Sequence, residues 1–262
     1  ATAGRRVGIG RLWADMGKFD RSAIVFDRAE ALDPGNMDIY LARGQIAMQT
    51  GNYADGAAIA DRALKAPAGE RRMDILPLAA ECYARTARVP DAQVRIEELK
   101  KSGAESEMLV FLQAVIDSAE GRADKAVRGF EDTVRRNSKF SRGQLNLARA
   151  LMANGEFERA VIPLREHVRL EHERGNAVTL GEIELTDLYA RTGRWEEAVR
   201  LAQDTERRTM GSWLFNHAIL TSTKVQATAA RPGGPKPNPK VLDGLQERMS
   251  RVLEQPNAAK DP

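Results

Sequence analysis

The chain has 262 residues, of which 42% are hydrophobic and 29% are charged, and its formal net charge is +3. No apolar run approaches the roughly 18 residues that a membrane-spanning helix needs, so the sequence excludes a helical membrane span. Basic and acidic residues alternate along almost the whole chain, which leaves no basic face for nucleic acid. We therefore expect no membrane span and no nucleic-acid partner.

The first residue is Ala1, and neither an initiator methionine nor a signal-like apolar segment is present at this end. We expect that a leader has been removed or that the sequence is part of a longer protein. Cys82 is the single cysteine, so no internal disulfide can form, and its place in a helical stretch predicts a buried side chain rather than a reactive thiol. These features fit either a cytoplasmic or a periplasmic location.

A short turn motif recurs along the chain at intervals of 34 to 38 residues. It begins with glycine or alanine, has an apolar residue two places later, and has a small residue three places after that. A period near 34 with small residues in fixed phase is typical of repeated helix–turn–helix units. The six copies start at Gly17, Gly51, Ala87, Gly121, Gly155 and Gly193.

Each copy of the motif predicts two helices. The first helix ends just before the turn glycine, which can take the left-handed conformation without a steric penalty, and the second begins two or three residues later. In the first repeat, Ser22, Phe26 and Ala29 share one face of the second helix because their spacings are 4 and 3. Ala87 replaces the turn glycine in the third repeat. We expect this change to make a helix end less sharply defined while the fold stays the same.

The pattern resembles that of the tetratricopeptide-repeat family. That pattern has a small residue in the first helix, glycine at the turn, an aromatic residue two places later, then alanine, an aromatic residue, alanine and a closing proline. In the first repeat, the matching residues are Gly10, Trp13, Gly17, Phe19, Phe26, Ala29 and Pro34. The resemblance implies an all-α fold, a right-handed α-solenoid of about six helical hairpins over residues 1–210. The hairpins are expected at about 3–36, 37–70, 73–106, 107–140, 141–176 and 179–211.

Two intervals exceed 34 residues and predict local changes. The extra residues before the third repeat fall in 66–70, where proline and glycine favour a looser turn. The extra residues before the sixth fall around 171–175 and amount to about one helical turn, so we expect the preceding helix to be longer. Pro163 lies inside that helix and is expected to bend it.

After the sixth repeat the pattern decays. Residues 212–254 are expected to form a degenerate seventh hairpin that covers the apolar end of the stack, as terminal repeats do. Four prolines and two glycines in 231–239 predict an exposed, semi-rigid loop within it, and residues 255–262 are expected to be a frayed tail.

The sequence offers no pattern for catalysis or for binding a metal or cofactor. His167 and His172 are five residues apart, so they do not share a helix face as metal ligands would. Gly8-Ile9-Gly10 follows no strand and continues as helix, so it is no phosphate-binding loop. We therefore expect no enzyme activity, no metal and no cofactor.

The expected binding surface is the concave face, which the family geometry assigns to the first helices of the hairpins. Methionine and aromatic residues in the middle of that face would make adaptable contacts with a partner segment. Phe111 and Val115 have a second interpretation, in which they only pack between hairpins. The residues expected to line the groove are Arg11, Gln45, Met48, Gln49, Glu81, Arg85, Phe111, Val115, Asn146, Arg149, Met152 and Asp187.

The resemblance and the lack of a catalytic pattern predict a non-catalytic protein–protein interaction scaffold that binds a peptide or protein segment in its concave groove. The carboxylate clamp of chaperone-binding members is absent, because its positions are occupied by Val7, Arg11, Ala42, Asp74 and Leu78. Two alternatives stay open. One is a bacterial envelope assembly component, such as the repeat region of a pilus or exopolysaccharide-export protein. The other is the recruiting or regulatory arm of an enzyme whose catalytic domain lies outside this chain.

Overall fold

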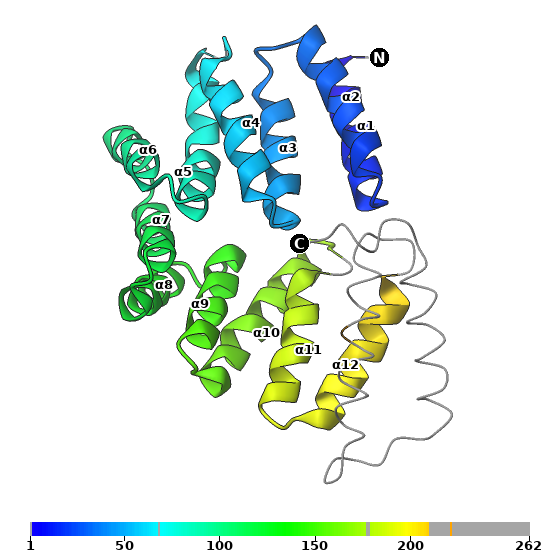
Figure 1. Cartoon of the computed structure of the whole chain (residues 1–262), viewed down its shortest axis with the longest axis vertical. Helices are drawn as coiled ribbons and strands as arrows, with labels where there is room; N and C mark the ends of the chain where they lie inside the picture. The colour runs from blue at the N-terminus through cyan, green and yellow to red at the C-terminus, as the bar shows by residue number, and fades with distance from the viewer. Residues whose placement is uncertain (1, 68, 177–178, 210–220, 222–262) are drawn as a thin grey trace. The chain divides into compact units, whose positions relative to one another are not determined.

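The computed structural model describes residues 2–67, 69–176, 179–209 and 221. Every regular element within these ranges is helical, with twelve α-helices and one short 3-10 helix. The helices follow one another as hairpins (Figure 1). The expected all-α solenoid of helical hairpins is therefore confirmed.

The α-helices alternate between the first and second positions of a hairpin. Adjacent pairs pack against each other, as α1 does on α2 and α7 does on α8. The bounds are α1 Ala3–Asp15, α2 Phe19–Leu32, α3 Met37–Gln49, α4 Tyr53–Lys65, α5 Leu76–Arg85, α6 Val89–Lys101, α7 Ser106–Ala119, α8 Ala123–Arg136, α9 Ser141–Ala153, α10 Phe157–Glu173, α11 Leu180–Arg191 and α12 Trp195–Arg208.

The chain divides into two compact units. Unit 1 comprises Ala1–Asn154 and unit 2 comprises Gly155–Pro262. The boundary falls between α9 and α10, inside the expected fifth repeat at 141–176. Each unit is described separately below.

The turn residues adopt the left-handed conformation that the motif predicts. Gly17, Gly51 and Gly121 have φ values of 70°, 73° and 74°, and an added Cβ at Gly51 or Gly121 would meet no atom within 4 Å. Their role is therefore conformational rather than steric. Ala87 adopts the same conformation with φ of 59°, which is unfavourable for a residue that has a Cβ.

Small residues elsewhere in the hairpins let two helices approach closely. A Cβ added to Gly10 would lie 2.7 Å from the Phe26 ring, and one added to Gly56 would lie 2.6 Å from Cys82 Sγ. The Ser22 hydroxyl donates a 2.8 Å hydrogen bond to the Gly10 carbonyl across the first hairpin. Larger residues at these positions would force the helices apart.

The two irregular intervals have different structural outcomes. The segment before the third hairpin forms a 3-10 helix, Gly69–Ile75, and α5 begins only at Leu76 because Pro77 occupies its first turn. The predicted helix extension before the sixth repeat is confirmed, since α10 has 17 residues where α8 and α12 have 14. Helix α10 continues through Pro163, and the expected bend stays a prediction.

The C-terminal expectations fall almost entirely outside the described residues. The predicted seventh hairpin at 212–254, apart from residue 221, the proline-rich loop at 231–239 and the tail at 255–262 all lie there.

The strained turn at Ala87 generates a stability prediction. We expect Ala87→Gly to raise the free energy of unfolding by about 0.5–1 kcal/mol, because glycine adopts positive φ without a clash. Urea denaturation followed by circular dichroism measures the change. Ala58→Gly, the same substitution at an exposed interior position of α4, should instead lower stability by about 0.5–1 kcal/mol. Equal effects at the two positions would contradict the strain at Ala87.

Candidate functional site

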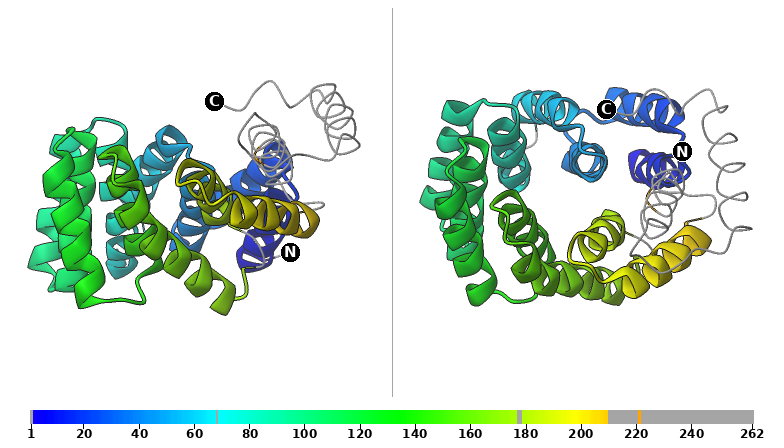
Figure 2. Two further views of the ribbon diagram at one scale, coloured as in Figure 1. Left: turned by 90° about the horizontal axis from the view of Figure 1, so that it is seen from below. Right: turned by 60° about the horizontal axis from the view of Figure 1, so that its bottom comes forward.

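The first helices of the hairpins lie on the inner side of unit 1. In Figure 2, α1, α3 and α5 lie inside the curve that α2, α4 and α6 form. The expected groove residues of unit 1 all belong to first helices, namely α1, α3, α5, α7 and α9. These are the helices to which the family geometry assigned them, while their place in a groove and their role in binding stay predictions.

A polar network joins α5 to α9 across the intervening α7. The Arg85 guanidinium donates a 2.6 Å hydrogen bond to Asn146 Oδ1 and two hydrogen bonds of 3.0 and 3.1 Å to Glu81 Oε1. Arg142 forms an ion pair with the other carboxylate oxygen of Glu81. We call Glu81, Arg85, Arg142 and Asn146 the α5–α9 bridge. It links the third hairpin to the fifth and therefore fixes the curvature of unit 1 locally.

Phe111 and Val115 lie in the core at this bridge. Phe111 is 0% exposed and Val115 is 1% exposed. The Phe111 ring has its centroid 5.0 Å from that of Phe140, and the Arg142 guanidinium carbon lies 5.3 Å from the Phe111 centroid. This burial favours the interpretation in which both residues pack between hairpins.

The α5–α9 bridge contains more positive than negative charge. The Glu81 side chain is only 2% exposed, and a carboxylate buried to this degree requires compensation. Two guanidinium groups, those of Arg85 and Arg142, surround this one carboxylate. Burial lowers the pKa of Arg142 to about 10, and the pKa of Arg85 is lowered mainly by burial and further by repulsion from Arg149. Both arginines stay charged near neutral pH, so the bridge carries an excess of positive charge.

The other expected groove residues are more dispersed. Arg11 donates a 3.0 Å hydrogen bond to Gln45 between α1 and α3, and both side chains are exposed. Met48 Sδ lies 3.3 Å from Cys82 Sγ. Gln49 is exposed at the end of α3, and Met152 is half-buried on α9.

One expected groove residue lies in unit 2. Asp187, on α11, accepts a 2.6 Å hydrogen bond from Arg191 one turn later on the same helix. Its membership of a single groove with the unit 1 residues stays a prediction.

Two residues of the bridge region were not among the sequence candidates. Arg142 precedes Asn146 by four residues, so its place on the same face of α9 was a usable signal. Tyr53 begins a second helix, α4, and the Arg85 guanidinium carbon lies 4.9 Å from its ring centroid. No sequence pattern indicated that a residue of a second helix, such as Tyr53 on α4, would lie beside the bridge.

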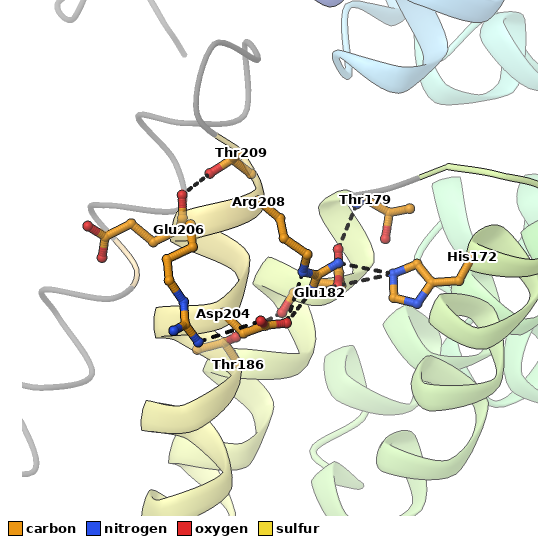
Figure 3. Close-up of polar contacts among 9 residues, drawn as sticks. His172, Thr179, Glu182, Thr186, Asp204, Glu206, Arg208 and Thr209 are labelled. Carbon is orange, nitrogen blue, oxygen red and sulfur yellow. Dashed lines mark hydrogen bonds and ion pairs between the residues drawn. The ribbon is translucent and has the colours of Figure 1, made fainter.

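Unit 2 contains a second polar cluster, which joins α10, α11 and α12 (Figure 3). The buried Glu182 carboxylate accepts hydrogen bonds from the Thr179 backbone N–H at 2.9 Å and from Arg208 at 2.5 Å. His172 Nε2 lies 3.2 Å from the same carboxylate, and Arg208 also pairs with Asp204 at 2.8 Å. Both oxygens of Glu182 have partners, so the cluster ties the three helices together.

The described residues show no metal site. The ring of His172 faces a carboxylate, whereas His167 is buried beside Gly181. Across residues 2–67, 69–176 and 179–209, no group of three or more His, Cys, Asp or Glu side chains is placed to hold a metal ion. No helix in the same ranges is long and apolar enough to cross a membrane.

The bridge carboxylate generates a stability prediction. We expect Glu81→Gln to lower the free energy of unfolding by about 3–5 kcal/mol, because it removes the negative charge that compensates two partly buried guanidinium groups. Urea denaturation measures the loss. The control is Glu97→Gln at an exposed position on α6, which should change stability by less than about 0.5 kcal/mol. A Glu81→Gln protein as stable as this control would show that the bridge is not a compensated charge network.

The buried thiol generates a reactivity prediction. Cys82 is 0% exposed, and burial raises the pKa of its thiol to about 12. Compared with an ordinary thiol of pKa about 8.5, the thiolate population at mildly alkaline pH falls roughly a thousandfold. We therefore expect a disulfide reagent to modify the native protein at least about a thousandfold more slowly than the urea-unfolded chain. Comparable rates in the two states would contradict the burial of Cys82.

Comparison with known sequences agrees with the hairpin architecture. Residues 8–71 and 111–171 match one tetratricopeptide-repeat model, and residues 183–212 match another. These regions together make up more than half of the chain. No curated protein matches the sequence significantly.

Solved structures show the same fold at low sequence identity. A chain of the APC/C Cut9–Hcn1 hetero-tetramer matches with a TM-score of 0.58 and 14% identity, over 90% of this chain and 48% of that chain. Yeast Tom70 matches with a TM-score of 0.56 and 19% identity, over 97% of this chain and 50% of that chain. The chain thus spans about half the length of these two proteins.

A third match is of similar length. A tetratricopeptide-repeat protein from Parabacteroides merdae matches with a TM-score of 0.59 and 12% identity, over 84% of both chains. At these identities the solved structures support the fold alone. Tetratricopeptide-repeat proteins are generally non-catalytic scaffolds that bind protein or peptide partners. By its repeat sequences and its stacked hairpins, the chain belongs to the tetratricopeptide-repeat family.

Proposed function

We propose that the protein is a non-catalytic scaffold that binds an extended segment of a partner protein along the concave side of unit 1. An acidic side chain of that segment docks against the α5–α9 bridge. The observation that carries the proposal is the unequal charge of the bridge, in which Arg85 and Arg142 share the single carboxylate of Glu81. A carboxylate from the partner balances the second guanidinium through charge-assisted hydrogen bonds.

The two arginines differ in their access to a partner. The Arg142 side chain is 42% exposed, whereas Arg85 is 19% exposed and Glu81 is 2% exposed. An incoming carboxylate therefore reaches Arg142 first and leaves Glu81 in place. An anion beside Arg142 also favours its charged form and so raises the lowered pKa of this guanidinium.

Half-buried apolar side chains lie on the two first helices that contact α5. Met48 on α3 and Met108 on α7 offer flexible thioethers that adapt to different partner side chains. Phe111 and Val115 support this surface from the core. Phe111→Ala would therefore cost roughly 3–5 kcal/mol of stability and would confuse a loss of binding with a loss of folding. The envelope-assembly and enzyme-arm roles stay sequence-based predictions.

Selection from a random-peptide display library tests the proposal. We expect peptides recovered on the purified chain to be enriched in aspartate and glutamate. Fluorescence anisotropy of labelled peptides should then show that Arg142→Gln weakens binding at least about tenfold, or 1.4 kcal/mol. Glutamine keeps much of the side-chain length and a hydrogen-bond donor while removing the charge.

The matched control is Arg207→Gln, because the Arg207 side chain on α12 is 76% exposed and lies in unit 2. This variant should bind the selected peptides as the unmodified chain does, and circular dichroism should show unchanged helicity for both variants. Selected peptides without acidic residues, or equal binding by the Arg142→Gln protein, would overturn the proposal.

A further inference from the structure

Helix α1 carries an exposed apolar stripe that none of the described helices covers. Ile9, Leu12 and Met16 are 40%, 60% and 48% exposed. Together with Arg5 they are spaced by four, three and four residues, which places Arg5, Ile9 and Leu12 on one face of α1, followed by Met16 at the C-cap of the helix. We call these four residues the α1 end face. Isolated exposed apolar residues are ordinary, but an aligned set on one helix is typical of an interaction surface.

The same helix position is buried in four of the five later hairpins and is half-buried, at Ile46, in the second. Leu12 lies five residues before its turn glycine, and its counterparts Cys82, Ile116 and Leu188 are each 0% exposed. Those residues belong to α5, α7 and α11, which pack against α4, α6 and α10 of the preceding hairpins. The α1 end face therefore continues an interface that this fold uses repeatedly, and its shape suits another helix.

The backbone of α1 is also accessible to a second helix. Gly4 and Gly8 are exposed, and a Cβ added to either would meet no atom within 4 Å. Each exposed glycine inside a helix costs about 1 kcal/mol relative to alanine. Neither glycine is needed for packing inside the described chain, whereas both permit close approach of a helix from outside.

The charges along α1 oppose its own helix dipole. Arg5 and Arg6 lie near the positive N-terminal end and Asp15 ends the helix, while the first turn has no acidic residue and the last turn no basic one. Each such placement costs roughly 0.3–1 kcal/mol at an exposed helix end. The same order of charges becomes favourable when an identical helix lies antiparallel beside α1, because the arginines of one helix then approach the C-terminal end of the other.

We propose that the α1 end face joins two copies of this chain in an antiparallel, two-fold symmetric dimer whose axis passes the middle of α1, between Gly8 and Leu12. In this register Leu12 of each copy packs against Gly8 of the other, and Met16 packs against Gly4. Arg5 of each copy then lies opposite Asp15 of the other. Such an interface is self-complementary, as two-fold symmetry requires. Because α1 is only about 20 Å long, the interface is small and the dimer is weak.

Sedimentation velocity of the full chain over a concentration series tests the proposal. We expect the weight-average mass to rise from that of a monomer towards that of a dimer. Leu12→Glu should weaken the association at least tenfold. Leu32→Glu is the matched control, because Leu32 ends α2 and is 61% exposed, and it should leave the association unchanged. Circular dichroism should show the same helicity for both variants.

A charge exchange tests the antiparallel orientation. Arg5→Glu alone should weaken the dimer, and adding Asp15→Arg to it should restore most of the affinity. A chain that stays monomeric at the highest soluble concentration would overturn the proposal, as would growth into assemblies larger than a dimer. Equal effects of Leu12→Glu and Leu32→Glu would overturn the placement of the interface, and a double variant weaker than Arg5→Glu would overturn its orientation.

Discussion

The close approach of paired helices is the constraint on which the hairpins depend. A single added carbon at Gly10 or Gly56 would collide with the neighbouring helix, and one at Gly129 would lie 2.7 Å from the Ala114 side chain. Small residues therefore recur in fixed phase, and the turn between the helices must be short and tight. The left-handed conformation at Gly17, Gly51 and their counterparts provides that turn. The regular period of the sequence follows from this geometry.

Each unit also contains a buried carboxylate that ties helices together, but the two differ in their charge balance. Glu81 faces two guanidinium groups, those of Arg85 and Arg142, and the network spans α5 to α9. Glu182 shares Arg208 with Asp204, so carboxylates outnumber guanidinium groups there. The surplus of positive charge at the first site is the feature on which the proposed binding of a partner carboxylate rests. The second site has no such surplus and stabilises the sixth hairpin on α10.

The bridge connects binding to the shape of unit 1. Arg85 and Asn146 are 61 residues apart in the chain, so their hydrogen bond holds the third and fifth hairpins at a fixed separation. A partner carboxylate at Arg142 would act on the same network that sets this separation. The proposed binding surface and the curvature of unit 1 therefore depend on the same set of side chains, those of the α5–α9 bridge.

The sequence by itself determined the features that depend on local contacts. The turn positions, the longer α10 and the burial of Cys82 follow from the phase of small residues, from helix periodicity and from apolar patterning within one hairpin. The start of α5 at Leu76 was not predicted from the sequence. The loose turn expected at 66–70 forms a 3-10 helix at Gly69–Ile75, which packs against α3 and α4.

Only the tertiary structure decided which side chains of the inner face lie together. Sequence phase placed Glu81, Arg85 and Asn146 on first helices, but it could not bring α9 to α5, because that distance sums small rotations between successive hairpins. Arg142 was also missed, although its place four residues before Asn146 on α9 was a usable signal. The sequence left two interpretations of Phe111, and its burial beside Phe140 favours packing between hairpins. The sequence could not decide this, because the contacts of a helix face depend on how the neighbouring hairpins stack on it.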